Sequence, residues 1–227
     1  MKTIIVVGGS KGIGKAIIAK LLTYCNVINI SRSIPDISHD NLTHYSCDIT
    51  QDKLPKIKNA DGLVYCPGSI NLKPISRLSI EDFKNDFEIN VLGAVISIQK
   101  YLPILKNGNN PSIILFSTVA AKLGMPYHAS IATSKAGVEG LVKSLGAELT
   151  PNIRINAIAP TVTDTNLSAK LLRNEKMIEN IKERHPLKKI LSPEEVADMA
   201  EFLLSKNSSS ISGQIFEMDC GIVSFKL

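Results

Sequence analysis

Short runs of apolar residues alternate along this chain with longer stretches whose apolar residues repeat at helical spacing. The short runs are rich in β-branched residues and typical of strands buried on both faces. We expect seven strands, at residues 3–7, 27–30, 43–47, 62–66, 112–118, 153–159 and 214–218. Helical spacing is expected at 12–22, 79–102, 128–150 and 193–204. Strands that alternate with helices predict an α/β fold, with a doubly wound parallel sheet between two helical layers.

The first predicted strand ends in a glycine-rich turn. Residues 8–14 read Gly-Gly-Ser-Lys-Gly-Ile-Gly, and a helical pattern with Ile17 and Ile18 on its apolar face follows. Glycines let a pyrophosphate approach the backbone, and a helix beginning at Gly12 offers it free N–H groups and a positive dipole end. An ordinary turn can carry the same glycines, but the place after an N-terminal strand favours nucleotide binding. The cofactor-binding candidates here are Gly8, Ser10, Lys11, Gly12, Ile13 and Gly14.

Basic residues stand where a bound dinucleotide would present its adenosine ribose. Arg32 leaves the end of the second predicted strand, where an acidic residue would bond the ribose 2′-OH of NAD. Arg32 and Lys11 suit a 2′-phosphate, so we expect NADP(H) to be preferred over NAD(H), with ordinary loop charge as the alternative. Asp48 and Ile49 follow the third strand, and Asp48 could contact the adenine or cap the next turn.

Composition limits the class of protein. The chain has 227 residues, 44% hydrophobic content and a formal net charge of +5, which suits one globular domain spanning 1–227. Scattered lysines argue against nucleic-acid binding, and no apolar run reaches transmembrane length. The chain start lacks a signal-peptide pattern. The cysteines have no metal-ligand spacing, so we expect no metal site and free thiols in the reducing cytoplasm: Cys25, Cys47, Cys66 and Cys220.

Further motifs resemble the short-chain dehydrogenase/reductase family, most closely its 3-oxoacyl-(acyl carrier protein) reductase members. They run in order along the whole chain: Asp48, Asn90, the segment Ile153–Pro160, Thr165, the segment 185–197 and the segment 212–219. The resemblance implies a Rossmann-type fold and hydride transfer between a nicotinamide cofactor and a carbonyl compound. It implies contacts to the nicotinamide half of the cofactor by Lys135, Pro160 and Thr165. It also implies active-site roles for Asn90 and for Thr118, which stands where the family has a serine.

The largest departure from the family lies in its Tyr-x-x-x-Lys motif. This chain has Ile131 and Lys135 at the two positions, so the lysine is present and the tyrosine is not. In relatives the phenol gives its proton to the carbonyl oxygen, with the lysine cation lowering its pKa. Isoleucine has no proton to give, whereas Lys135 can still hold the ribose hydroxyls. A second departure is Tyr65-Cys66-Pro67-Gly68 in place of Asn-Asn-Ala-Gly.

Two residues just before the predicted helix could replace the phenol. His128 is the better candidate, because imidazole titrates near neutral pH. It precedes Ile131 by three residues, so it shares that helix face if the helix has begun. Tyr127 lies about 12 Å from Lys135 along a regular helix, too far to repeat the usual contact. Either ring could instead be a pocket or surface residue.

We therefore predict an NADP(H)-dependent oxidoreductase that reduces a carbonyl compound. The resemblance implies a 3-oxoacyl thioester, which an acyl carrier could bear, as the substrate class. Thr118 would bond the carbonyl oxygen, Asn90 would support it and His128 would serve as the acid. The excursion Thr165–His185 would cover the substrate.

The sequence leaves open two alternative functions and the oligomeric state. A catalytically impaired NADP(H)-binding sensor or scaffold would also keep the pocket and lack the proton donor. A lyase or isomerase is a third hypothesis, which no residue favours. The family is often tetrameric, so we expect a homo-oligomer, a dimer or tetramer, with contacts along the Lys135 helix and the C-terminal strand. The apolar tail would suit such an interface or the protein's own core: Ile222, Val223, Phe225 and Leu227.

Overall fold

Seven parallel strands form one sheet in the computed structural model, which describes residues 1–224. Phe225 and Leu227 of the apolar tail lie outside the described residues. The sheet order is β3-β2-β1-β4-β5-β6-β7, and each pairing is parallel. The strands are β1 (Lys2–Val7), β2 (Cys25–Ser31), β3 (Leu42–Ser46), β4 (Gly62–Tyr65), β5 (Ser112–Phe116), β6 (Arg154–Pro160) and β7 (Ile215–Met218). The order reverses between β1 and β4, which opens a crevice at their carboxyl ends.

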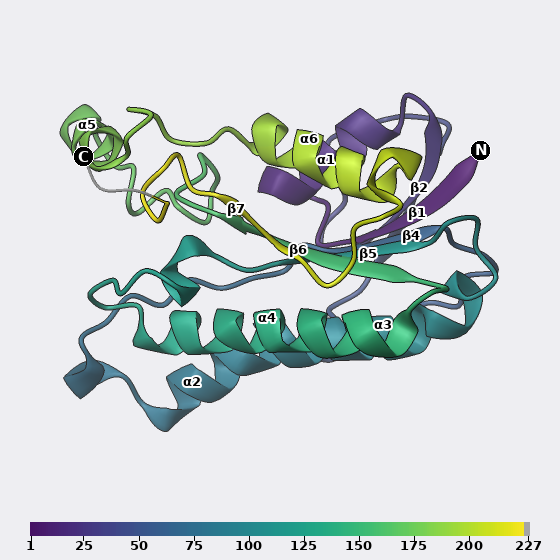
Figure 1. Ribbon diagram of the computed structural model, residues 1–227, viewed down its shortest axis with the longest axis horizontal. Helices are drawn as coiled ribbons and strands as arrows, with labels where there is room; N and C mark the ends of the chain where they lie inside the picture. The colour runs from purple at the N-terminus through teal and green to yellow at the C-terminus, as the bar shows by residue number, and fades with distance from the viewer. Residues whose placement is uncertain (225–227) are drawn as a thin grey trace.

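Helices cover both faces of this sheet, so the predicted three-layer α/β/α architecture is confirmed (Figure 1). One face carries α1 (Gly12–Leu21) and α6 (Pro193–Leu204), and the other carries α3 (Gly93–Leu105) and α4 (Ala129–Leu149). α2 (Ile80–Phe87) packs beside α4 and continues through a π-helical turn, Glu88–Leu92, into α3. α5 (Glu175–Arg184) lies towards one end of the molecule and has no buried residue. Short 3₁₀ turns occur at Ile75–Arg77, Val119–Ala121 and Lys206–Ser208.

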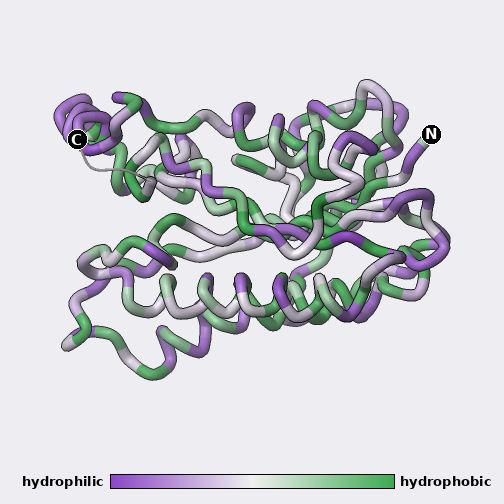
Figure 2. Tube along the Cα trace, in the orientation of Figure 1, coloured by the Kyte–Doolittle hydropathy of each residue, from purple (hydrophilic) through white to green (hydrophobic). Residues whose placement is uncertain are grey.

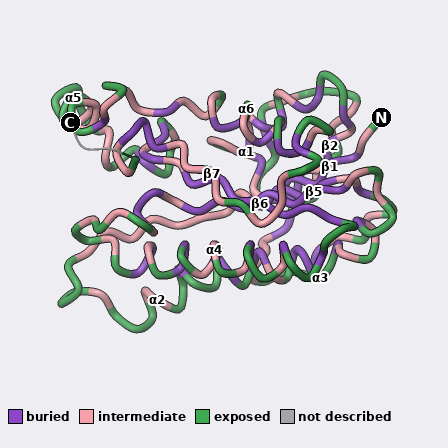
Figure 3. The backbone as a smooth tube through the Cα atoms, viewed as in Figure 1, coloured by how far each residue is buried: buried purple, intermediate pink, exposed green. Residues whose placement is uncertain are grey.

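The core consists of two apolar layers, one on each face of the sheet. Because side chains alternate along a strand, Ile5 and Val7 face α3 and α4 while Ile4 and Val6 face α1 and α6. The central strands β1, β4, β5 and β6 are the apolar centre of the chain trace (Figure 2) and also its most buried part (Figure 3). This continuous burial explains why short apolar runs predicted them, whereas the edge strands β3 and β7 are partly exposed.

Some predicted boundaries were wrong. The expected helix at 79–102 is divided by the π-helical turn, and it passes Pro103 to end at Leu105. Pro103 lies in the last turn of α3, so the backbone hydrogen bond that it removes is lost only near the end of the helix. The strand expected at 112–118 ends at Phe116, since Thr118 already caps the next turn. Ser79 and Asp82 form a capping box at the start of α2. No helix among residues 1–224 is long and apolar enough to cross a membrane.

Candidate active site

A cavity of about 370 Å³ lies at the carboxyl ends of β1, β2 and β4. It runs from the glycine turn to Arg32 on one side and to the segment after β6 on the other. Ten of the residues expected to bind the cofactor line it: Gly8, Ser10, Lys11, Gly12, Ile13, Gly14, Arg32, Asp48, Ile49 and Thr165. The sheet topology therefore brings together loops that are far apart in the sequence.

The glycine turn has the backbone that a phosphate site requires. Gly12 has φ of +53°, in the left-handed region that favours glycine. A Cβ on Gly14 would lie 2.4 Å from the carbonyl oxygen of Gly8, so the turn and helix can approach closely only because residue 14 is glycine. No side chain caps the N-terminus of α1, and its first turn has no acidic residue. The free N–H groups there fit a dinucleotide pyrophosphate.

Arg32 and Asp48 mark the far side of this cavity. The Arg32 side chain is 82% exposed, and its Nη1 lies 4.0 Å from Asp48 Oδ2. Asp48 Oδ1 accepts hydrogen bonds from the backbone N–H of Thr50 (3.0 Å) and from its hydroxyl (2.8 Å), and these bonds hold the pKa of the carboxyl below its usual range. Asp48 therefore caps the following turn, one of the two roles that the sequence left open. Its contact with adenine stays a prediction.

A second, more apolar cavity of about 180 Å³ adjoins the first. The two share five lining residues: Ile13, Cys66, Gly68, Thr165 and Leu167. The second cavity is also lined by the residues expected at the reacting end of the cofactor: Thr118, His128, Ile131, Lys135 and Pro160. The site is therefore one continuous crevice with a phosphate-binding end and a reacting end.

Lys135 is the buried cation of the reacting end. Its Nζ donates a hydrogen bond to the carbonyl oxygen of Phe116 at 2.8 Å, and the residue is 8% exposed. Burial lowers the pKa of its ammonium group to about 8, against the opposing influence of Cys66 and Asp86. Burial also raises the pKa of the Cys66 thiol to about 12, so Cys66 is a neutral neighbour at physiological pH. Two of the three ammonium hydrogens remain available to a ligand.

Thr118 and Ser117 are adjacent hydroxyls with different surroundings. Thr118 lines the second cavity, and its oxygen accepts a hydrogen bond from the backbone N–H of Ala120 at 3.3 Å. Its hydroxyl hydrogen is therefore free to meet a carbonyl oxygen in the cavity. Ser117 also lines this cavity, but its hydroxyl donates to Glu139 Oε1 at 2.7 Å, in the interface between β5 and α4. Thr118 thus fits the role expected from its position, and Ser117 does not.

His128 lies at the mouth of the second cavity, but the helix has not begun there. It is the N-cap of α4, with φ of −100° and ψ of 9°, because the left-handed backbone of Tyr127 (φ +70°) precedes the helix. The expectation of a shared helix face with Ile131 is therefore wrong, although both residues line the cavity. His128 Nδ1 donates to the carbonyl oxygen of Pro126 at 2.7 Å. That bond leaves Nε2 as the ring atom able to exchange a proton.

Asn90 is the expected site residue that lines neither cavity. It is 2% exposed, and its Nδ2 donates to Ser69 Oγ (2.9 Å) and to the carbonyl oxygen of Asp86 (2.7 Å). Its Oδ1 has no hydrogen-bond partner among the described residues. Asp86 and Ser69 were missed in the sequence because their contacts join α2 to a loop after β4. The sequence signal that could have indicated Asp86 was a polar residue one turn before Asn90, on the inner face of the predicted helix.

The segment after β6 covers the reacting end. Thr165, Leu167, Ser168 and Leu171 line the second cavity. Beyond α5 the chain is fixed by His185, which is 2% exposed and whose Nε2 lies 2.7 Å from Thr161 Oγ1. The covering segment is therefore attached at both ends. No group of three or more potential metal ligands occurs within residues 1–224.

Comparison with known proteins agrees with this geometry. The profile of a family described as "Enoyl-(Acyl carrier protein) reductase" matches residues 36–223. The 3-oxoacyl-[acyl-carrier-protein] reductase FabG of Rickettsia prowazekii is 31% identical over 235 residues, which cover 98% of this chain and 97% of that protein. Ligand-free aldohexose dehydrogenase of Thermoplasma acidophilum has a TM-score of 0.89 at 27% identity, covering 99% of this chain and 95% of that one. ElxO with NADP bound has a TM-score of 0.90 at 25% identity, covering 99% and 100%.

Proposed function

Because the chain belongs to the short-chain dehydrogenase/reductase family, we propose that it is an NADP(H)-dependent oxidoreductase that reduces a carbonyl group to an alcohol. The observation that carries the proposal is the continuous crevice. It joins an uncapped helix N-terminus at Gly12 to the Thr118 hydroxyl and the Lys135 ammonium group. An anion-binding end and a carbonyl-polarising end are the two features that hydride transfer needs.

The preference for the phosphorylated cofactor is supported by charge. Arg32 is exposed beside the crevice, and Lys11 is the exposed N-cap of α1. Both can reach an anion at the ribose end, and Arg32 offers a planar guanidinium for bidentate phosphate contact. The similarity to ElxO with NADP bound supports the same cofactor. At the other end, Lys135, Pro160 and Thr165 would hold the nicotinamide half.

Each residue of the reacting end would have its own role in the reaction. When bound, the reduced nicotinamide supplies the hydride. Thr118 would donate a hydrogen bond to the substrate oxygen as negative charge develops there, and Lys135 would add the field of a buried cation. Asn90 would support this end from outside the two cavities, since it lines neither. Ile131 fills the cavity wall and supplies no proton.

The proton would come from His128. Its Nδ1–H is held by the carbonyl oxygen of Pro126, so the protonated ring presents Nε2–H as its second donor. Its place at the cavity mouth also allows it to take a new proton from solvent. This role accounts for turnover without the phenol that most family members use.

The proposed substrate is a 3-oxoacyl thioester, which an acyl carrier could bear. The apolar lining of the second cavity suits a short acyl chain: Ile70, Phe116, Val119, Met125, Ile131, Val162 and Leu171. The similarity to the FabG reductase of Rickettsia prowazekii supports the same class. We further propose a cytoplasmic homo-oligomer, in keeping with the free thiols and with apolar side chains exposed on α2 and α3.

Substitution of His128 tests the proton source. We expect His128→Ala to lower kcat by about 10²–10⁴-fold, the usual effect of removing a general acid, while NADPH affinity stays within twofold. Absorbance of the reduced nicotinamide measures turnover, and its fluorescence measures binding. His39→Ala is the matched control, since His39 is exposed in the loop before β3 and lines neither cavity. Unchanged turnover in His128→Ala would exclude His128 as the acid, and loss of NADPH binding would assign it a structural role.

A further inference from the structure

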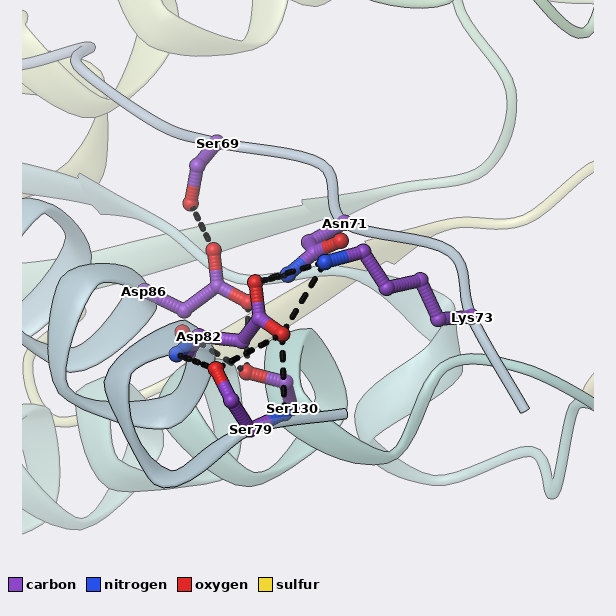
Figure 4. A network of polar contacts seen from close by, with 7 residues as sticks. All are labelled: Ser69, Asn71, Lys73, Ser79, Asp82, Asp86 and Ser130. Atoms are coloured by element: carbon purple, nitrogen blue, oxygen red, sulfur yellow. Dashed lines mark hydrogen bonds and ion pairs between the residues drawn. The ribbon is translucent and has the colours of Figure 1, made fainter. Parts of the chain in front are cut away.

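Asp86 is a buried carboxylate to which the reaction scheme gives no role. It is 3% exposed, and its two oxygens accept hydrogen bonds from Ser69 Oγ (2.5 Å) and Ser130 Oγ (2.6 Å). Figure 4 shows it between the loop after β4 and the first turn of α4. No ion pair to Asp86 occurs within the described part of the chain. Its hydroxyl partners are neutral, so its negative charge acts on the nearest buried cation.

Asp82, one turn earlier on α2, shows the contrast. Its carboxylate forms an ion pair with Lys73 at 2.8 Å and accepts a further bond from Asn71 Nδ2 at 2.8 Å, also visible in Figure 4. The charge of Asp82 is therefore compensated locally. Asp86 has no such cation beside it, and its charge raises the pKa of Lys135 against the effect of burial.

A chain of hydrogen bonds leads from Asp86 through Ser69 to Asn90, beside the same lysine. Ser69 donates to Asp86 and accepts from Asn90 Nδ2, and Nδ2 also donates to the Asp86 carbonyl oxygen. These bonds fix the Asn90 amide so that Oδ1 is its unpaired atom. A Cβ built on Gly68 would lie 3.3 Å from Asn90 Oδ1 and 3.6 Å from Lys135 Nζ. The acceptor and the ammonium group therefore converge on the space beside Gly68.

We propose that Asp86 is a positioning residue of this site, which places a buried negative charge beside the Asn90 amide and, through Ser69, directs Asn90 Oδ1 towards the Lys135 ammonium group. The need for a charged Lys135 rests on the proposed function, because ribose hydroxyls and a developing oxyanion both require donors. Burial alone favours the neutral amine. The buried carboxylate opposes that tendency without touching the ligand.

The other titratable groups around Lys135 cannot supply this negative charge. Cys66 is a neutral thiol at physiological pH. Glu139, one turn further along α4, is bonded to Ser117 and partly exposed, so solvent screens it. His128 lies at the cavity mouth and brings positive charge when protonated. Asp86 is therefore the buried negative group whose charge acts on the lysine.

Asp86→Asn removes the charge and keeps the shape. The serines can satisfy the new amide, because Ser130 Oγ also lies 3.3 Å from the carbonyl oxygen of Asp82 and can turn its hydrogen there. The readout is an NMR titration of lysine side chains labelled with ¹³C and ¹⁵N, in protein without cofactor. Lys135→Arg identifies the signal. We expect the midpoint of Lys135 to fall by about one pH unit in Asp86→Asn.

Asp82→Asn, with its Lys73-compensated charge, is the matched control and should leave the Lys135 midpoint unchanged. A midpoint in Asp86→Asn equal to or above that of wild type would overturn the proposal. Should Asp86→Asn not fold, the carboxyl carbon of Asp86 in ¹³C-aspartate-labelled wild type decides the question. Its resonance should move at the midpoint of Lys135. A resonance that does not move there would refute the role.

NADPH binding separates this inference from the proposed function. At pH 8 a midpoint one unit lower leaves about a tenth of Lys135 protonated instead of half, so the NADPH Kd should rise about fivefold in Asp86→Asn. If wild type bound no NADPH but the Lys135 midpoint still fell in Asp86→Asn, the proposed function would fail and the role of Asp86 would stand. If wild type bound NADPH and the Lys135 midpoint did not move in Asp86→Asn, the proposed function would stand and the role of Asp86 would fail.

Discussion

Lys135 shows how a single residue can oppose stability while serving a site. Its ammonium group is buried with one carbonyl partner, at Phe116, and its pKa is lowered from 10.5 to about 8. A basic group whose pKa is lower in the folded than in the unfolded protein reduces stability at every pH at which the unfolded chain binds more of its proton. The cost is therefore greatest below pH 8 and disappears above pH 10.5.

Lys135→Met tests this conflict. We expect the variant to exceed wild type in free energy of unfolding at pH 7, by about 3 kcal/mol, because it buries no charge. The difference should shrink as pH rises from 8 to 10.5, since wild type gains stability there. Thermal and urea unfolding across that range measure it. NADPH affinity should fall in the same variant, and a variant less stable than wild type at pH 7 would show that the buried charge is well compensated.

Residue-scale features were the least predictable from sequence. The absence of a tyrosine at Ile131 was plain from the motif, and Thr118 and Lys135 line the cavity as expected. The network of Asp86, Ser69 and Ser130 could not be predicted, because it joins three elements by side-chain contacts with no sequence spacing of their own. The place of His128 outside the helix depends on the left-handed Tyr127, which no propensity indicates.

At the scale of elements, the turn between β1 and α1 sets the geometry of the cofactor end. Gly14 packs against the Gly8 carbonyl so closely that a Cβ would overlap backbone. We expect Gly14→Ala to destabilise the protein by about 1–3 kcal/mol and to weaken NADPH binding at least tenfold. Gly140→Ala is the control, because nothing lies within 4 Å of its Cβ position on α4, and it should stabilise by about 0.5–1 kcal/mol.

Chemical denaturation and NADPH fluorescence measure both variants. Equal stability of Gly14→Ala and wild type would mean that the turn can open without loss, and the close approach would then have no bearing on cofactor binding.

Element boundaries followed from sequence where burial is continuous. The central strands were found because they are apolar on both faces, whereas the edge strands β3 and β7 are partly exposed. The helix start at Pro193 agrees with a proline in the first turn. The π-helical turn Glu88–Leu92 was not foreseen. It adds a residue to a helix without a composition of its own, and packing against α4 determines it.

For the whole molecule, the strand order fixes where chemistry can occur. Both cavities lie at the carboxyl ends of the strands, and the strand order reverses between β1 and β4. This general position was predictable from the alternation of strands and helices. The prediction of a single domain over 1–227 and the substrate remain proposals, since a parallel sheet of this order serves many reactions.

Assembly is a further whole-molecule prediction. Phe87, Leu92 and Ile96 expose 41%, 44% and 46% of their surface along α2, the π-helical turn and α3, beside α4. We expect sedimentation at micromolar concentration to give a dimer or tetramer, because contiguous exposed apolar side chains on a helical face favour burial in an interface. Ile96→Lys should dissociate it without unfolding the chain. A monomeric wild type would contradict the expected homo-oligomer.

The most direct test of the account is NADPH oxidation by wild type and by Ile131→Tyr, followed on a generic 3-oxoacyl thioester and a panel of simple ketones. We expect wild-type turnover above the background without enzyme, and an increase of about 10²-fold or more in Ile131→Tyr, because a phenol would then stand one turn before Lys135 in the cavity wall. Turnover by Ile131→Tyr with none by wild type would contradict the account, and would indicate that the natural protein binds the cofactor without reducing a carbonyl.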